Sequence, residues 1–322
     1  MPQPEIDLLG PERATLEDIE ALNRLFADAF TDRYHRDGMT GVRVPFLNPL
    51  VWRYAIEDAG EGAMLWRDGE GRLAAFNMAH LSGVEGWMGP LAVRPQLQGS
   101  GLGTRIVREA ITWLERRGAA IIGLETMPRT VENIGFYSGL GFVPGHLTIS
   151  MVKELEVGPL PQVASQRMPA AGESRVGPLE AARALTDRLG PGVDYTRELA
   201  LTEDLAMGGT TFVPGAARPR AFALWHQAAL AQGRTSDELR VLKVVAADHS
   251  AFLDVIRAVE QQAAELPGIL RVSIRCQSAF RGAYTTLLEL GYRVHWTDLR
   301  MTWADPGLGG DPAGILLSNW EI

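Results

Sequence analysis

The stretch QLQGSGLGTR, residues 96–105, carries glycine at three alternate positions, Gly99, Gly101 and Gly103. It follows the apolar run LAV and precedes IVREAITWL, whose apolar residues have helical spacing. A strand that enters a helix through such a loop leaves the first helical N–H groups without partners inside the helix. Small residues let an anion approach those groups, and the helix dipole favours negative charge there. The loop is therefore either a plain turn whose glycines permit positive φ or an anion-binding loop.

The spacing of these glycines excludes two nucleotide-binding motifs. A Walker A loop requires Lys and then Ser or Thr after its last glycine, whereas Thr104 and Arg105 follow Gly103. The dinucleotide fingerprint requires GxGxxG, and the third glycine is missing whether the count begins at Gly99 or at Gly101. An anion at this loop is therefore bound by a different motif.

Two further patterns do fit the sequence. Gln98, Gly101 and Gly103 meet Gln-x-x-Gly-x-Gly directly after a predicted strand, and FYSGLGF at residues 136–142 meets Tyr-x-x-x-Gly-Phe. With these two motifs in this order, and the strands and helices around them, most of residues 10–155 resembles the GCN5-related N-acetyltransferase (GNAT) superfamily. Either motif alone is weak, but the pair at this spacing is specific.

The resemblance implies that the glycine loop binds the pyrophosphate of acetyl-coenzyme A through backbone amides. It also implies that the fourth strand splays apart at Leu91–Val93 and offers N–H groups to the pantetheine arm and the thioester. The cofactor-binding residues expected from the resemblance are Leu91, Ala92, Val93, Gln98, Gly99, Ser100, Gly101, Leu102, Gly103, Thr104 and Asn133. Asn133 departs from the family pattern, because Thr130 stands where many members have the asparagine. Asn133 therefore either reaches coenzyme A or caps and packs its helix.

The resemblance further implies direct transfer of the acetyl group to an amine in a ternary complex, with acetyl-CoA as co-substrate and no metal. Tyr137 matches the family's general acid for the coenzyme A thiolate, and a phenol of pKa about 10 is a suitable proton donor. The alternative is that Tyr137 is only an amphipathic core residue beside Phe136.

The general base is less clear from the sequence. Only about one alkyl amine in 10³ is neutral at pH 7, so a protein group or a water chain must remove the proton. Glu125 on the fifth strand and Glu85 at the start of the fourth are level candidates, and His80 on the third strand follows them. Glu125 lies in the apolar run IIGLET, where an idle charge is costly. Each of the three also has a structural explanation as a turn, strand-end or hydrogen-bonded residue.

Composition and charge narrow the class of protein. The net charge of −8 argues against broad nucleic-acid binding, and no apolar stretch approaches the roughly 20 residues of a membrane span. The start, MPQPEIDLLG, lacks the pattern of a secretory signal. The single cysteine, Cys276, cannot form an internal disulfide and is expected to be a buried small residue. We expect a cytoplasmic protein, monomeric or homodimeric.

The chain also repeats itself. At an offset of 150, Gly118 pairs with Gly268, LGF at 140–142 with LGY at 290–292, and Met151 with Met301. The expected organisation is an acetyl-CoA-binding GNAT domain at 1–157, a Pro-rich linker at 158–174, and a degenerate GNAT-like domain at 175–322. Each half is expected to have the α/β class, as a mixed sheet flanked by helices.

The second half lacks the site residues. The positions of Gln98, Gly101 and Gly103 are taken by Asp248, Ala251 and Leu253, and that of Tyr137 by Leu287. The second half is therefore expected to keep the fold without the pyrophosphate loop, and to shape the acceptor pocket or a dimer surface.

Two functions remain open from the sequence. The first is N-acetylation of a small-molecule or peptide amine that the sequence does not identify. The second is a coenzyme A-binding sensor or scaffold with little or no transfer. Other tandem proteins of this fold use aminoacyl-tRNA or build thiol cofactors, but the acidic charge speaks against tRNA. Intact Tyr137 favours transfer, whereas the missing obvious base leaves the sensor open.

Overall fold

The computed structural model of the chain describes residues 8–155, 158 and 161–321. Residues 1–7, on which much of the prediction about a secretory signal depends, lie outside the described residues. So does residue 157, the predicted end of the first domain.

The elements of the first half follow one another as β1 (Leu8–Arg13), η1 (Leu16–Asp18), α1 (Ile19–Arg36), α2 (Pro49–Ala59), η2 (Gly60–Gly62), β2 (Ala63–Asp68), β3 (Leu73–Ser82), β4 (Glu85–Val93), η3 (Pro95–Leu97), α3 (Leu102–Arg116), β5 (Ile121–Thr126), α4 (Val131–Gly139) and β6 (Val143–Glu154). Those of the second half are β7 (Gln166–Arg167), α5 (Val176–Leu189), α6 (Thr196–Asp204), β8 (Gly208–Val213), β9 (Ala221–His226), β10 (Glu238–Ala246), α7 (His249–Glu265), β11 (Arg271–Gln277), α8 (Arg281–Glu289), β12 (Arg293–Ala304) and β13 (Ile315–Ser318).

The two halves repeat the same order of elements, as the offset predicts. Helices α4 and α8 begin and end 150 residues apart, and so do strands β6 and β12. The predicted α/β class with two similarly built halves is confirmed. One part of the predicted linker is different, because β7 lies within it and pairs with β8.

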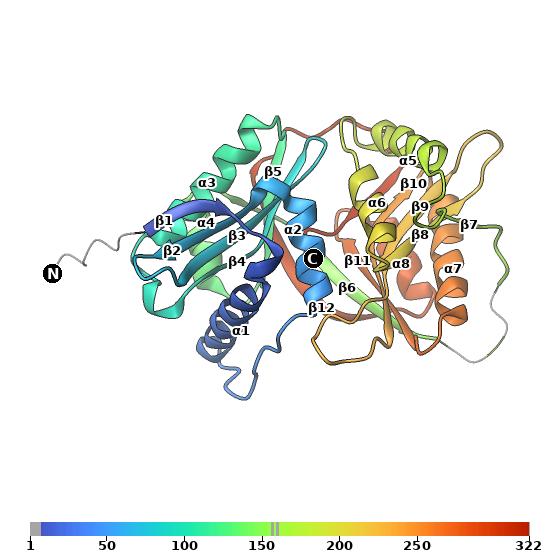
Figure 1. Ribbon diagram of the computed structural model, residues 1–322. Helices are drawn as coiled ribbons and strands as arrows, with labels where there is room; N and C mark the ends of the chain where they lie inside the picture. Colours follow the sequence, from blue (N-terminus) through green and yellow to red (C-terminus); the bar gives the residue numbers. More distant parts are fainter. Residues whose placement is uncertain (1–7, 156–157, 159–160, 322) are drawn as a thin grey trace.

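The thirteen strands of the described residues form one sheet, and the halves exchange strands at its centre. Its order is β1-β2-β3-β4-β5-β12-β6-β11-β10-β9-β8-β7, with β13 paired to β10. Strand β12 of the second half lies against β5 of the first, and β6 of the first half lies between β12 and β11. Figure 1 shows β6 and β12 between the two halves. The repeat predicted a sheet for each half, and this interleaving joins them into one.

Helices cover both faces of the sheet in the first half. On α3, the predicted apolar face of Ile106, Val107, Ala110 and Leu114 is fully buried against the sheet. Helices α1 and α2 pack in a separate apolar cluster, which includes the buried Trp52 and Phe76. Burying a large apolar side chain stabilises the folded state by about 1.5–3 kcal/mol. These clusters therefore hold in place the strands of the first half, whose ends form the site.

Buried polar side chains also join the two halves. The Ser82 hydroxyl donates to Glu198 on α6, and Arg197 Nε donates to Asp58 on α2 at 2.9 Å. Burial raises the pKa of Glu198 to about 7, and the negative charge of Asp58 adds to the rise. The carboxyl of Glu198 therefore takes up a proton on folding at acid pH.

This raised pKa predicts a pH-dependent stability. A raised folded-state pKa stabilises the fold below the ordinary Glu value, and this stabilisation is lost as pH rises through about 7. Glu198→Gln removes this pH dependence. The free energy of unfolding of the variant, relative to that of the native chain, is therefore expected to be about 3 kcal/mol higher at pH 8 than at pH 5. Urea unfolding at the two pH values measures this gain. Glu180→Gln, on the exposed face of α5, is the control, and an equal difference at both pH values for Glu198→Gln would contradict the prediction.

Candidate active site

The glycine loop leads into the start of α3 with an open space in front of it. Gly99 and Gly101 have φ of +77° and +87°, a conformation that L side chains rarely adopt, and a Cβ at either position meets nothing within 4 Å. No side chain caps the N-terminus of α3. The loop thus presents helical N–H groups without a side-chain partner, as an anion site requires.

The corresponding helix of the second half has its own anion. Asp248 precedes α7, and its carboxylate accepts from the N–H of Ala251 at 2.8 Å. This is an ordinary N-cap, and it places a negative charge at the position that the first half leaves open. The prediction that Asp248 brings negative charge to this position is therefore confirmed.

The sheet opens beside the glycine loop. Strands β4 and β5 pair in parallel only over Glu85–Trp87 and Ile121–Gly123, although β4 continues to Val93. The second half has a similar opening, because β10 and β11 pair only over Glu238–Val241 with Arg271–Ile274. There, β13 fills the opening by pairing with Lys243–Ala246 of β10.

A cavity of about 550 Å³, here called the loop cavity, lies along the glycine loop and β4. The predicted cofactor-binding residues among its lining are Leu91, Ala92, Val93, Gln98, Gly99, Gly101, Gly103, Thr104 and Asn133. Two predicted residues lie elsewhere: the Ser100 hydroxyl donates to the Leu97 carbonyl at 2.6 Å, and Leu102 packs in the core at 3% exposure.

A second cavity of about 410 Å³, here called the inner cavity, shares part of this lining and continues between the halves. First-half residues on its wall include Phe26, Phe30, Tyr34, Met88, Leu91, Glu125, Asn133 and Tyr137. The second half supplies Leu230, Arg275, Trp296, Asp298, Trp320 and Glu321. Leu230 lies on the long β9–β10 connection, where its carbonyl accepts from the N–H of Asn48 at 2.7 Å.

Tyr137 lines both cavities. Its ring packs between Phe136 and Phe142, with centroids 5.0 and 5.7 Å away. Its hydroxyl makes no hydrogen bond to any of the described residues, and burial raises its pKa above the ordinary value. The phenol therefore stays protonated and keeps a donor for a ligand.

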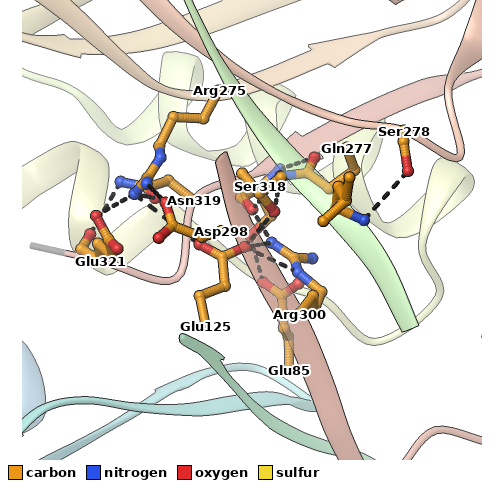
Figure 2. Close-up of polar contacts among 12 residues, drawn as sticks. Glu85, Glu125, Arg275, Gln277, Ser278, Asp298, Arg300, Ser318, Asn319 and Glu321 are labelled. Carbon is orange, nitrogen blue, oxygen red and sulfur yellow. Dashed lines mark hydrogen bonds and ion pairs between the residues drawn. The ribbon is translucent and has the colours of Figure 1, made fainter. Parts of the chain in front are cut away.

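Glu125 lies on the wall of the inner cavity in a network of arginines. Arg300 of β12 donates from Nε and Nη2 to its Oε1 at 3.0 and 2.7 Å, and the Thr148 hydroxyl donates to the same oxygen (Figure 2). Burial tends to raise the pKa of Glu125, but Arg300 and Arg275 together lower it. The two arginines therefore stabilise Glu125 in its ionised form, which makes this carboxylate a weak proton acceptor.

The other two candidates for the base lie away from both cavity walls. Glu85 is buried and accepts from the Tyr195 hydroxyl at 3.0 Å and from the Ser318 hydroxyl at 2.8 Å. His80 is fully buried, with Nδ1 hydrogen-bonded to Asp58 and its ring stacked on Trp87. The structure thus places Glu125 and Tyr137 in the lining of the inner cavity, and leaves Glu85 and His80 outside both cavities.

The sequence missed the charged residues that the second half supplies. Arg275, Asp298 and Glu321 line the inner cavity, and Arg300 holds Glu125 from behind (Figure 2). The segment HWTDLRMTW is recognisable as a strand, but nothing in it indicates that it lies against β5. Cys276 is fully buried on β11, which confirms the expected buried small residue, and burial raises the pKa of its thiol to about 12.

Residues 19–142 match the family model of the acetyltransferase (GNAT) family. This range holds the glycine loop, the opening beside β4, and Tyr137. This part of the chain is therefore similar to the acetyltransferase (GNAT) family.

Similar structures cover both halves. A Pyrococcus horikoshii protein described as an acetyltransferase has a TM-score of 0.68 at 15% identity, covering 99% of this chain and 96% of its own. A tandem GNAT protein from the clavulanic acid biosynthesis pathway has a TM-score of 0.61 at 13% identity, covering 92% and 98%. At these identities the likeness shows that this chain shares their fold across both halves.

One curated relative is similar in sequence over a shorter range. The bS18-alanine N-acetyltransferase of Escherichia coli K12 is 35% identical over 72 residues, which is 22% of this chain. The chain spans about half the length of this relative, 49%. No helix among the described residues is long and apolar enough to cross a membrane.

Proposed function

We propose that this protein is an acetyl-CoA-dependent N-acetyltransferase that transfers acetyl directly to an amine. The observation that carries the proposal is Tyr137, which lines both the loop cavity and the inner cavity. Two cavities that share one proton donor suit two reactants that must meet there.

In the proposed complex, acetyl-CoA lies in the loop cavity. The uncapped N-terminus of α3 receives the pyrophosphate, since its N–H groups and dipole favour an anion. The opened edge of β4 at Leu91–Val93 receives the pantetheine arm, which places the thioester near Tyr137. Asn133 lines both cavities, and its Nδ2 donates to the Thr126 hydroxyl at 3.3 Å, so it positions the wall between them.

The acceptor amine occupies the inner cavity and attacks the thioester carbonyl carbon. A new carbon–nitrogen bond forms as the carbon–sulfur bond breaks, and Tyr137 donates its proton to the departing thiolate. The attacking nitrogen loses a proton to water or to a protein base. The buried tyrosine keeps this proton because burial raises its pKa. Among the predicted bases, Glu125 lines the same cavity and Glu85 does not, and the role of either as proton acceptor stays a prediction.

The second half supports the reaction without binding acetyl-CoA. Asp248 caps α7 and β13 fills the opening of its sheet, so both places that would take the cofactor are occupied by the chain itself. We therefore expect one acetyl-CoA per chain. The alternative, a coenzyme A sensor or scaffold, differs in binding acetyl-CoA without transferring its acetyl group.

The test is thiol release from acetyl-CoA with a panel of aminoglycosides, polyamines, amino acids and peptide amino termini. Release with at least one class supports transfer, and tight binding without release supports the sensor. Gly101→Ala is expected to raise the Kd of acetyl-CoA about tenfold, because a side chain strains the loop at φ +87°. Gly118→Ala is the matched control, since Gly118 has φ +82° and equally open space outside the loop. Equal weakening by both variants, or two acetyl-CoA per chain, would contradict the assigned loop.

A further inference from the structure

The inner cavity has an aromatic wall and a charged floor. Its aromatic side chains include Tyr34 on α1, Trp296 on β12 and Trp320 after β13. Three carboxylates, Glu125, Asp298 and Glu321, gather on the floor, and the latter two come from the second half. Two of the three carboxylates therefore come from the second half, and Figure 2 shows them near Glu125.

One oxygen of Glu125 is left without a partner. Its side chain is fully buried, and Oε1 accepts every hydrogen bond that Glu125 makes among the described residues. Oε2 has no hydrogen bond to the described residues, and Arg275 Nη1 lies 3.9 Å from it. A buried carboxylate oxygen without a donor is costly, so a donor from a ligand in the cavity would relieve it.

The guanidinium on this floor is already occupied. Arg275 Nη2 donates to Asp298, and Nη1 donates to Glu321 and, at 3.0 Å, to Asn319 Oδ1. An anionic ligand would have to displace these partners. With Arg300 counted, three carboxyl groups face two guanidiniums. Burial raises the pKa of Asp298 and raises that of Glu321 to about 7, so the floor favours a cation when these two carboxyls are ionised.

Glu321 is the accessible member of the cluster. Its side chain is 47% exposed, and its only hydrogen bond to a described residue uses Oε2. The Asp298 carboxylate is buried and is held by Arg275 and by Trp296 Nε1 at 3.2 Å. A ligand donor can therefore reach Glu321 from the cavity, and contact with the buried Oε2 of Glu125 requires the cavity lining to open.

We infer that the acceptor is a diamine with an apolar body, whose second, unreacting ammonium group binds between Glu125 and Glu321. This inference rests on the proposed transferase function and names its substrate class. The reacting nitrogen must lose its proton before it attacks the thioester. Glu125 is kept ionised by Arg300, so it is better suited to bind the second nitrogen, which stays protonated as an ammonium group. The aromatic wall packs the apolar body. The rings of Trp320 and Trp296 already have the guanidiniums of Arg300 and Arg129 over them.

The test uses the full chain and three amines that share one ring. They are 4-(aminomethyl)benzylamine, 4-methylbenzylamine and 4-(aminomethyl)benzoic acid, in which the second group is cationic, neutral and anionic. We expect kcat/KM for the diamine to exceed that for the neutral amine about tenfold, with the acid lowest. Calorimetric binding in the presence of coenzyme A is expected to give the same order without requiring turnover.

Two variants test whether Glu321 causes the preference for the diamine. Glu321→Gln is expected to reduce the ratio of diamine to monoamine about tenfold in both measurements. Glu289→Gln, exposed on α8, is the control and should keep the native ratio. Equal values for the three amines, or a preference for the acid, would overturn the inference while leaving transferase activity established. No thiol release with any amine would instead reject the proposed function, and the binding order would still decide the charge preference.

Discussion

Residues 1–157 expressed alone are expected to transfer acetyl groups at least about 100-fold more slowly than the full chain. The fragment lacks β12, so β5 loses its neighbour and the inner cavity loses Trp296, Asp298 and the residues after β13. It also leaves Glu125 without Arg300, whose guanidinium fixes the position of this carboxylate in the full chain. Misplacement of a reactant by even 1 Å can cost about 100-fold in rate. Thiol release with matched protein concentrations measures the difference.

A chain cleaved between the two halves is the control for the fragment. It keeps every strand and lacks only the covalent link between the halves. Cleavage at a protease site introduced near Ser165, in the exposed segment between the halves, keeps all residues but breaks the connection. Because β6 and β12 lie between strands of both halves, we expect the cleaved halves to co-elute and to keep most of their activity. Halves that separate after cleavage, or a fully active 1–157 fragment, would contradict the role of the exchanged strands.

Local features of the fold follow from the sequence because they depend on neighbouring residues. The apolar spacing of IVREAITWL correctly gives the buried face of α3, and the glycines at 99 and 101 mark a loop that needs positive φ. The offset of 150 gives the repeated order of strands and helices. Each of these predictions depends on one short segment of sequence or on the comparison of two such segments.

The exchanged strands could not be predicted in the same way. Strands β6 and β12 occupy equivalent positions in the repeat, so either one has the pattern to pair with β5. Periodicity gives the faces of a strand but not its neighbour. The charged floor depends on this choice, since Arg300 reaches Glu125 only when β12 lies beside β5. This is why Tyr137 could be proposed from a motif while Asp298 and Glu321 could not.

Tyr137→Phe is expected to lower kcat about 10²-fold or more while changing the Kd of acetyl-CoA by less than about threefold. A positioned general acid contributes about 10²–10⁴ in rate, and phenylalanine keeps the ring contacts with Phe136 and Phe142 but removes the proton donor. The Tyr137 hydroxyl makes no hydrogen bond to the described residues, so its removal leaves no buried partner unsatisfied there. Stability should therefore change little, and steady-state rates with direct binding of acetyl-CoA separate kcat from affinity.

The pH profile tests the same role independently. Burial raises the pKa of Tyr137 above its ordinary value of about 10, so the native enzyme should lose no activity up to about pH 10 through ionisation of this donor. Tyr284→Phe, on the equivalent helix α8, is the matched control and should keep the native rate. An unchanged kcat for Tyr137→Phe would remove the general acid and leave Tyr137 as a packing residue between the two cavities. A rate lost together with acetyl-CoA affinity would instead assign its hydroxyl to cofactor binding, because the reaction then fails before the thiolate needs a proton.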